Sequence, residues 1–248
     1  MKISWEITEG DIQQVKKVLA QNDNNFTRRR RERNVEKKDV VIDKEMIMQA
    51  MMMCLITSQQ RSGPNSLVSI FLVKKPFPVT FQILSQSDNI ARTIKQVLLI
   101  NGLKRYVNNI SKYYAANYEK IEKDNWSIIT ELKDLLYKDS KREERKIADK
   151  IDESFLGFGP KQSRNFLQAL GLTKYEIPID SRIIRWLNML GFPVTLHSTP
   201  LGNKEYYHFV LDGVQELSAN SGVYPCILDA AIFSSYDKGE WTSENIRF

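Results

Sequence analysis

The chain has 248 residues, 42% of them hydrophobic, which is enough to bury a core of ordinary size in one large domain or two closely packed lobes. Lys and Arg total 36 against 30 Asp and Glu, and the formal charge of +6 favours polyanionic partners only if the cations gather on one face. The 2 cysteines exclude a disulfide framework. The sequence shows no signal-peptide pattern and no apolar run of about 20 residues. It therefore predicts a soluble protein of a reducing, intracellular compartment.

Apolar residues recur at helical spacing far more often than in strict alternation, so the sequence predicts an all-α fold. A first helix is expected over residues 10–20, with Val15 and Val18 on its apolar side. The next segment, 22–38, carries four consecutive arginines at 28–31 and too little apolar content to pack. We expect an exposed loop or a mobile arm there, whose charge would favour phosphates.

A second clear helix begins after Asp43, which is placed to cap it. Met46, Ala50 and Met53 share one face of this helix, so the methionines are predicted to be core residues rather than ligands of a metal or cofactor. The helix ends near Thr57, before the turn at 62–64. Further helices joined by short connections are expected over 65–73, 80–86, 89–100, 103–121, 126–137 and 140–152.

Residues 155–171 predict a helix, a tight glycine hairpin and a second helix. Gly157 and Gly159 permit positive φ and close backbone approach, and Pro160 suits the first turn of the helix that follows. Gly171 is expected just past the end of that helix. The free N–H groups beside the hairpin would form a cradle for a phosphate, whereas the simpler alternative is an ordinary turn between packed helices.

Asp180 precedes a run with helical apolar spacing and is therefore expected to cap another helix. A buried helix is predicted over 226–233. His197 and His208 have no partners at ligand spacing, so we expect ordinary loop or surface residues and no catalytic metal.

Two of these motifs resemble those of the helix-hairpin-helix (HhH-GPD) superfamily of DNA glycosylases. The hairpin of that superfamily is similar to Leu156-Gly157-Phe158-Gly159-Pro160-Lys161, and its proline and aspartate loop is similar to Ile177-Pro178-Ile179-Asp180-Ser181-Arg182. Lys161 and Asp180 are nineteen residues apart, as in the 8-oxoguanine DNA glycosylase branch. The segment that family members push into the duplex resembles Leu55-Ile56-Thr57-Ser58-Gln59, with Gln59 as the residue that fills the gap.

The resemblance implies a bilobal helical fold with the active site in the cleft between the lobes. One lobe, residues 45–172, would be a helical barrel that ends with the hairpin, and the other would combine residues 1–44 and 173–248. The implied function is base excision repair by a DNA glycosylase with AP lyase activity, with 8-oxoguanine favoured as the excised base. The implied partner is double-stranded DNA with a damaged base, bound by a monomer at the nucleoid in the cytoplasm or in the nucleus.

The same resemblance assigns roles to individual residues. Lys161 would be the nucleophile that forms a Schiff base, and Asp180 would stabilise positive charge on the sugar. An alkali ion at the hairpin carbonyls is compatible with the family, whereas 2 cysteines are too few for its iron–sulfur cluster. The expected DNA contacts are Gly157, Phe158, Gly159, Pro160, Gln59, Gln162 and Arg182. Aromatic residues available to stack on the base are Trp126, Trp186, Phe233, Tyr236 and Trp241.

Three alternatives stay open at this stage. The substrate of a glycosylase could be an oxidised pyrimidine. A non-catalytic DNA-binding protein would use the hairpin for phosphates, and Lys161 and Asp180 would be a helix charge and a cap. A helical interaction scaffold would have no salt-sensitive affinity for DNA.

Overall fold

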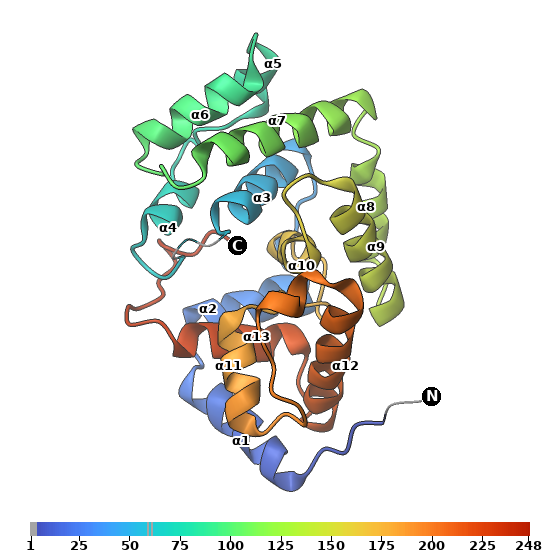
Figure 1. Cartoon of the computed structure of the whole chain (residues 1–248). Coiled ribbons are helices and arrows are strands. Elements are labelled where there is room, and N and C mark those ends of the chain that lie inside the picture. Colours follow the sequence, from blue (N-terminus) through green and yellow to red (C-terminus); the bar gives the residue numbers. More distant parts are fainter. Residues whose placement is uncertain (1–3, 59, 61) are drawn as a thin grey trace.

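The computed structural model describes residues 4–58, 60 and 62–248, which form helices and connecting loops without a strand among them (Figure 1). The predicted all-α class is therefore confirmed. Within this part of the chain, none of the helices has the length and apolar character needed to cross a membrane. In chain order the elements are α1 (Glu9–Gln21), α2 (Asn25–Arg30), the π-helix η1 (Arg31–Val35), α3 (Lys44–Ile56), α4 (Leu67–Leu72), α5 (Phe81–Ser85), α6 (Ile90–Ile100), α7 (Val107–Lys123), α8 (Ile128–Leu136), α9 (Lys141–Ser154), α10 (Pro160–Ala169), α11 (Ser181–Leu190), the 3₁₀ helix η2 (Thr199–Gly202), α12 (Lys204–Asn220) and α13 (Pro225–Ser235).

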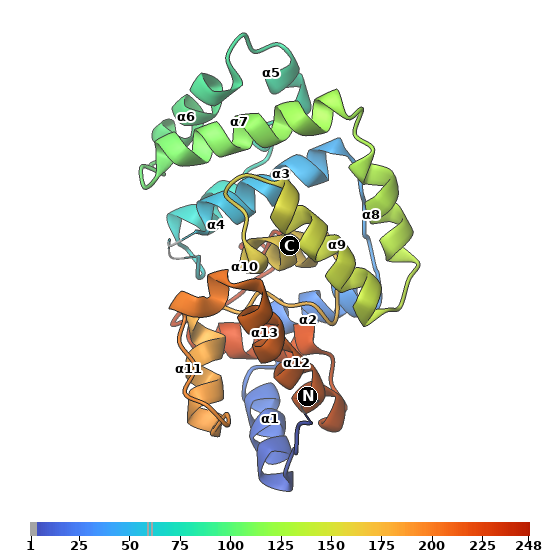
Figure 2. The same ribbon diagram turned by 45° about the vertical axis from the view of Figure 1, so that its right-hand side comes forward.

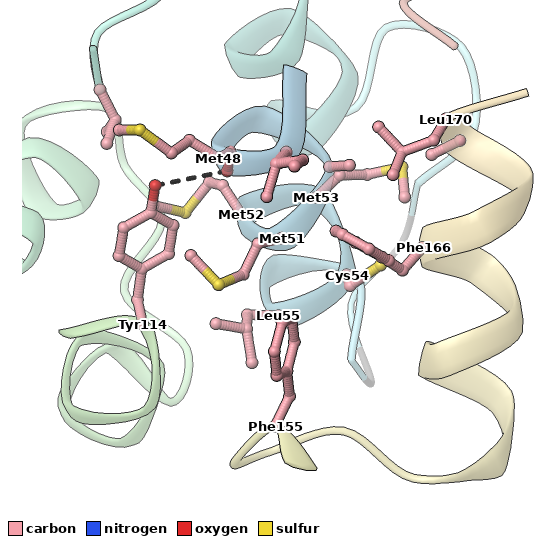
Figure 3. Close-up of a cluster of buried hydrophobic side chains, with 14 of the residues drawn as sticks. Met48, Met51, Met52, Met53, Cys54, Leu55, Tyr114, Phe155, Phe166 and Leu170 are labelled. Atoms are coloured by element: carbon pink, nitrogen blue, oxygen red, sulfur yellow. Dashed lines mark hydrogen bonds between the residues drawn. The ribbon is translucent and has the colours of Figure 1, made fainter. Parts of the chain in front are cut away.

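Helix α3 lies at the centre of a first hydrophobic core, which gathers buried residues between 42 and 172. Every α3 residue from Ile47 to Ile56 is buried, as expected for a helix that is apolar on all sides. Figure 3 shows its methionines among Tyr114 of α7, Phe155 and Phe166. Asp43 caps the helix by accepting from the Met46 backbone N–H at 2.8 Å. The methionines are thus core residues, as predicted.

A second core joins both ends of the chain. It contains Val15 and Val18 of α1 together with buried residues between 177 and 232, from α11, α12 and α13. Figures 1 and 2 show α1 beside α12 and α13, below the helices of the first core. The first core takes its buried residues from 42–172 and the second from 15–18 and 177–232, and the predicted lobe boundaries stay a prediction.

The basic segment 22–38 is folded, so the prediction of an exposed loop or mobile arm was wrong. It forms α2 and η1, and α2 packs against α13. Thr27, Arg30, Arg33 and Asn34 are buried. Three side chains donate to the last carbonyls of the α10 region: Arg33 to Ala169, Asn34 to Gln168 and Lys37 to Gly171, at 2.9, 3.0 and 2.9 Å. Carbonyls at the end of a helix lack the usual partner four residues further on, so they can accept from such donors.

A buried charge network connects α10 to the helices on either side. Arg164 of α10 donates through Nε to Glu176 at 2.9 Å and through a terminal nitrogen to Asp149 of α9 at 2.6 Å. The prediction for His208 as a plain surface residue was wrong, because its Nε2 lies 3.2 Å from Asp149 and 3.0 Å from Arg164. His197 is exposed in a loop, as predicted. The network therefore fixes α10 against α9 and α12.

Arg164→Met is expected to lower the free energy of unfolding by about 3 kcal/mol, because Glu176 and Asp149 lose a buried cation. The matched control is Lys150→Met, which breaks an exposed pair with Glu131 and should cost less than about 1 kcal/mol. Urea denaturation followed by circular dichroism measures both. Equal losses would mean that the buried network contributes no more to stability than a surface pair.

Candidate active site

A cavity of about 590 Å³ lies between the two cores. Met53 and Leu72 of the first core and Ile179 and Leu201 of the second all line it. Its volume is typical of pockets that bind small organic groups. The cavity is thus located in the predicted cleft, and it receives side chains from the hairpin region, the start of α11 and α13.

The predicted glycine hairpin is present before α10. Gly157 has φ +77°, and a Cβ there would lie 2.4 Å from a ring carbon of Tyr113. Gly159 has extended backbone and is the N-cap of α10, and a Cβ there would have no atom of a described residue within 4 Å. Asn117 of α7 fixes the hairpin by donating to the Leu156 carbonyl at 2.9 Å and accepting from its N–H at 2.7 Å.

Lys161 is the second residue of α10 and lines the cavity. The helix is held in place by Phe166, Leu167 and Leu170, which lie fully buried in the first core. The Lys161 side chain has no hydrogen bond or ion pair with any residue that the structure describes. Its amine is therefore available to a molecule in the cavity.

Asp180 lines the same cavity and is the N-cap of α11, as predicted. Its Oδ1 accepts from the backbone N–H groups of Arg182 and Ile183 at 2.8 and 3.2 Å. Its Oδ2 accepts from the Arg182 guanidinium at 3.3 Å. The guanidinium carbon lies 4.0 Å from the centre of the Phe233 ring, so Arg182 covers one face of that ring.

The remaining predicted DNA-contact residues lie in different surroundings. Gln162 is buried and donates to Ser58 at 2.8 Å, while Phe158 packs against Phe155 and Phe166. Pro160 is buried and lines the cavity. Gln59 lies outside the described residues. The DNA contacts assigned to these residues stay predictions.

Two of the five aromatic candidates, Phe233 and Trp241, line the cavity. They are joined by Phe26 of α2, whose ring centre lies 5.3 Å from that of Phe233 and 4.7 Å from that of Trp241. Trp126 is instead part of the first core, and Trp186 and Tyr236 pack against the second. The cavity therefore has an aromatic wall, to which the basic segment contributes one ring.

Sequence reasoning did not identify Asp229 of α13, which lies in the cavity wall with its side chain 7% exposed. Burial raises the pKa of Asp229 to about 7. Gln168 donates to its Oδ2 at 2.9 Å, and Arg30 of α2 lies 3.4 Å from the same oxygen. A signal was present, because this aspartate interrupts an otherwise apolar helix.

The last residues of the chain also line the cavity. Arg247 donates through Nε to Gln49 of α3 at 3.0 Å, and Phe248 packs against the first core. Figure 1 shows this end of the chain beside α3, although it follows helices of the second core. The segment thus also connects the two cores at the cavity.

The described residues contain no group of three His, Cys, Asp or Glu side chains arranged to hold a metal ion. The predicted alkali ion would bind backbone carbonyls at the hairpin instead, and it stays a prediction. Cys54 and Cys226 are both buried and unpaired with each other. The side chains that line the cavity offer an amine, carboxylates, guanidinium groups and aromatic rings.

No family model and no curated protein matches this sequence. Among solved structures, the chain is similar to the 8-oxoguanine DNA glycosylase of Thermotoga maritima, with a TM-score of 0.65 and 13% sequence identity. The match covers 92% of this chain and 96% of that chain. At this level of identity the likeness concerns the fold, and the chain has the helical fold found in that glycosylase.

Proposed function

We propose that the protein is a DNA glycosylase with AP lyase activity, in which Lys161 is the nucleophile and Asp180 its carboxylate partner. The observation that carries the proposal concerns one cavity beside a glycine hairpin. It is lined by a capping carboxylate and by an amine that has no hydrogen-bond or ion-pair partner among the described residues. The fold shared with an 8-oxoguanine DNA glycosylase supports it. The substrate is a double-stranded DNA from which the damaged nucleotide is turned out into the cavity.

The chemistry follows from the amine. Its lone pair attacks C1′ of the nucleotide while the bond from C1′ to the base breaks, and the base leaves with the bonding pair and takes one amine proton. The ring oxygen then leaves C1′ and takes a proton from solvent, which produces a protonated Schiff base on Lys161. Loss of a C2′ proton breaks the C3′–O bond, so the strand is cut by β-elimination. The Asp180 carboxylate stabilises the positive charge that develops on the sugar.

We propose 8-oxoguanine as the favoured base, on the strength of the nineteen-residue spacing and the activity named for the similar structure. The cavity volume of about 590 Å³ accommodates a purine or a pyrimidine, so the lesion must be tested directly. The experiment incubates the protein with duplexes that each carry one lesion, with and without borohydride. We expect base release, strand nicking and a trapped adduct with 8-oxoguanine. Preference for an oxidised pyrimidine would correct the substrate, and salt-sensitive binding without any base release would favour the non-catalytic alternative.

The hairpin glycines allow a separate test of DNA binding. Gly159→Val should weaken binding to undamaged duplex by roughly tenfold, because the side chain would occupy the space where a phosphate approaches the free N–H groups. The protein should stay folded, since the backbone there is extended and a Cβ meets no described residue within 4 Å. Fluorescence anisotropy at several salt concentrations measures the affinity and its salt dependence.

Gly10→Ala in α1 is the matched control, because α1 belongs to the second core and does not line the cavity. It should leave affinity unchanged. Gly157 is unsuitable for this purpose, since its positive φ and the contact with Tyr113 would disturb the fold itself. Unchanged affinity in folded Gly159→Val would contradict the role of the hairpin in binding phosphates.

A further inference from the structure

Arg30 is a buried cation in the wall of the cavity. It comes from α2, its side chain is 10% exposed, and its guanidinium carbon lies 5.4 Å from the centre of the Phe26 ring. Its ion pair with Asp229 joins residues 199 positions apart in the sequence. A desolvated arginine is retained in a protein where its charge is compensated, and here the partner is a cavity carboxylate.

The hydrogen bonds of Asp229 leave one of its two carboxylate oxygens available to a molecule bound in the cavity. Arg30 and Gln168 both contact Oδ2, at 3.4 and 2.9 Å. Among the residues that the structure describes, Oδ1 has no hydrogen-bond donor, and Asp229 lines the cavity. The two donors therefore fix the carboxyl group through one oxygen and leave the other as an acceptor toward the cavity.

The ionisation of Asp229 depends on several neighbours. Burial is the largest influence on its pKa and raises it, while Arg30 is the largest influence that lowers it. Among the described residues, the other charged and titratable groups that interact electrostatically with Asp229 are Lys161 of α10, Asp180 and Arg182 at the start of α11, Tyr207 of α12 and Cys226 of α13. Removing the charge of Arg30 would raise the pKa of Asp229 further, so more of the carboxyl would be protonated at neutral pH.

We propose that Arg30 is a positioning residue that orients Asp229 and favours its ionised form, as an acceptor for an N–H group of the nucleobase held in the cavity. This inference rests on the proposed function, because it requires that an extruded base enters. The Oδ1 atom accepts a hydrogen bond from a base edge that carries N–H donors, as a purine with a keto group does. A charged acceptor gives a stronger hydrogen bond than a neutral one, and a protonated carboxyl would offer a competing O–H group.

The first test measures ionisation without DNA or catalysis. Carboxyl ¹³C NMR follows Asp229 as pH is varied, and its resonance is assigned by its loss in Asp229→Asn. In Arg30→Gln, which keeps a donor without the charge, we expect the midpoint to rise by about one pH unit from its value near 7 in the parent. Arg30→Lys should restore it. Arg30→Met serves as a second neutral variant if Arg30→Gln folds poorly, and an unmoved midpoint in a folded neutral variant would overturn the inference.

The second test measures single-turnover excision of 8-oxoguanine across pH. A pKa raised from about 7 to about 8 would leave the ionised fraction at pH 7 about fivefold lower, while the two proteins converge near pH 9. Arg30→Gln should therefore lose about fivefold at pH 7 and almost nothing at pH 9. In the Asp229→Asn background the same substitution should have little further effect, since Arg30 acts through Asp229.

Two outcomes separate this inference from the proposed function. If Arg30→Gln slows excision equally with and without Asp229, Arg30 acts by another route and the inference fails, although the enzyme remains a glycosylase. If the NMR midpoints move as expected but no duplex loses a base, the proposed function fails. The assignment of a nucleobase as the ligand of Asp229 then fails with it. The effect of Arg30 on the ionisation of Asp229 would then stand alone.

Discussion

Lys161→Gln is expected to abolish the borohydride-trapped adduct and to reduce strand nicking by roughly 10⁴-fold or more. Glutamine has similar length but no nucleophilic amine, so neither attack on C1′ nor Schiff-base formation can occur. Lys161 makes no hydrogen bond or ion pair within the described residues, so the variant should remain folded. Denaturing gel electrophoresis of an end-labelled 8-oxoguanine duplex measures nicking and trapping in one experiment.

The matched control is Lys95→Gln, which removes an exposed amine on α6 that does not line the cavity. It should trap and nick as the parent does. Binding of Lys161→Gln to the duplex should persist, because the hairpin N–H groups are unchanged. A trapped adduct that survives in Lys161→Gln would identify a different amine as the nucleophile and would refute the central assignment.

Asp180→Asn is expected to slow base excision by roughly 10² to 10³-fold while leaving the protein folded. Asparagine is itself a good N-cap, so its side-chain oxygen can still accept from the backbone N–H groups of Arg182 and Ile183. The substitution removes the negative charge, and with it the 3.3 Å ion pair to the Arg182 guanidinium. Single-turnover excision and urea denaturation measure the two consequences separately.

Asp43→Asn provides the comparison, since Asp43 also caps a helix but does not line the cavity. Both variants should lose similar, small amounts of stability, and only Asp180→Asn should lose activity. If Asp180→Asn unfolds while its remaining folded fraction reacts at the normal rate, the residue is a cap and nothing more.

Most helices could be predicted because their signals are local. Helix α6 was expected over 89–100 and begins at Ile90 with Asn89 as its cap, and the hairpin helix follows Gly159 and Pro160 as predicted. Caps, turns and apolar spacing act within a few residues, so a single sequence contains them. Helix α12 was not predicted, and its buried polar residues, such as Gln215 and Ser218, interrupt the apolar pattern.

The site was predictable only in part, because some of its residues stand in local motifs and others are placed by long-range packing. Lys161 and Asp180 stood in motifs, and the structure places both at one cavity. The fold of segment 22–38 was missed because two of its arginines, Arg30 and Arg33, are buried by partners far along the chain. Its composition alone resembled that of a solvated loop. The roles of Arg30 and Asp229 in the cavity wall depend on that packing, which no local pattern contains.

The side chains of segment 22–38 bind partners far along the chain, which affects the order in which the chain folds. Arg33 binds a carbonyl 136 residues later, and Arg30 binds a carboxylate 199 residues later. Contacts of such high sequence separation form slowly, because a long loop must close first. During synthesis on the ribosome, residues 42–172 can complete their core before α13 exists, while α1 and α2 must wait for it. The wall that carries Arg30 and Asp229 is therefore expected to be among the last parts of the molecule to form.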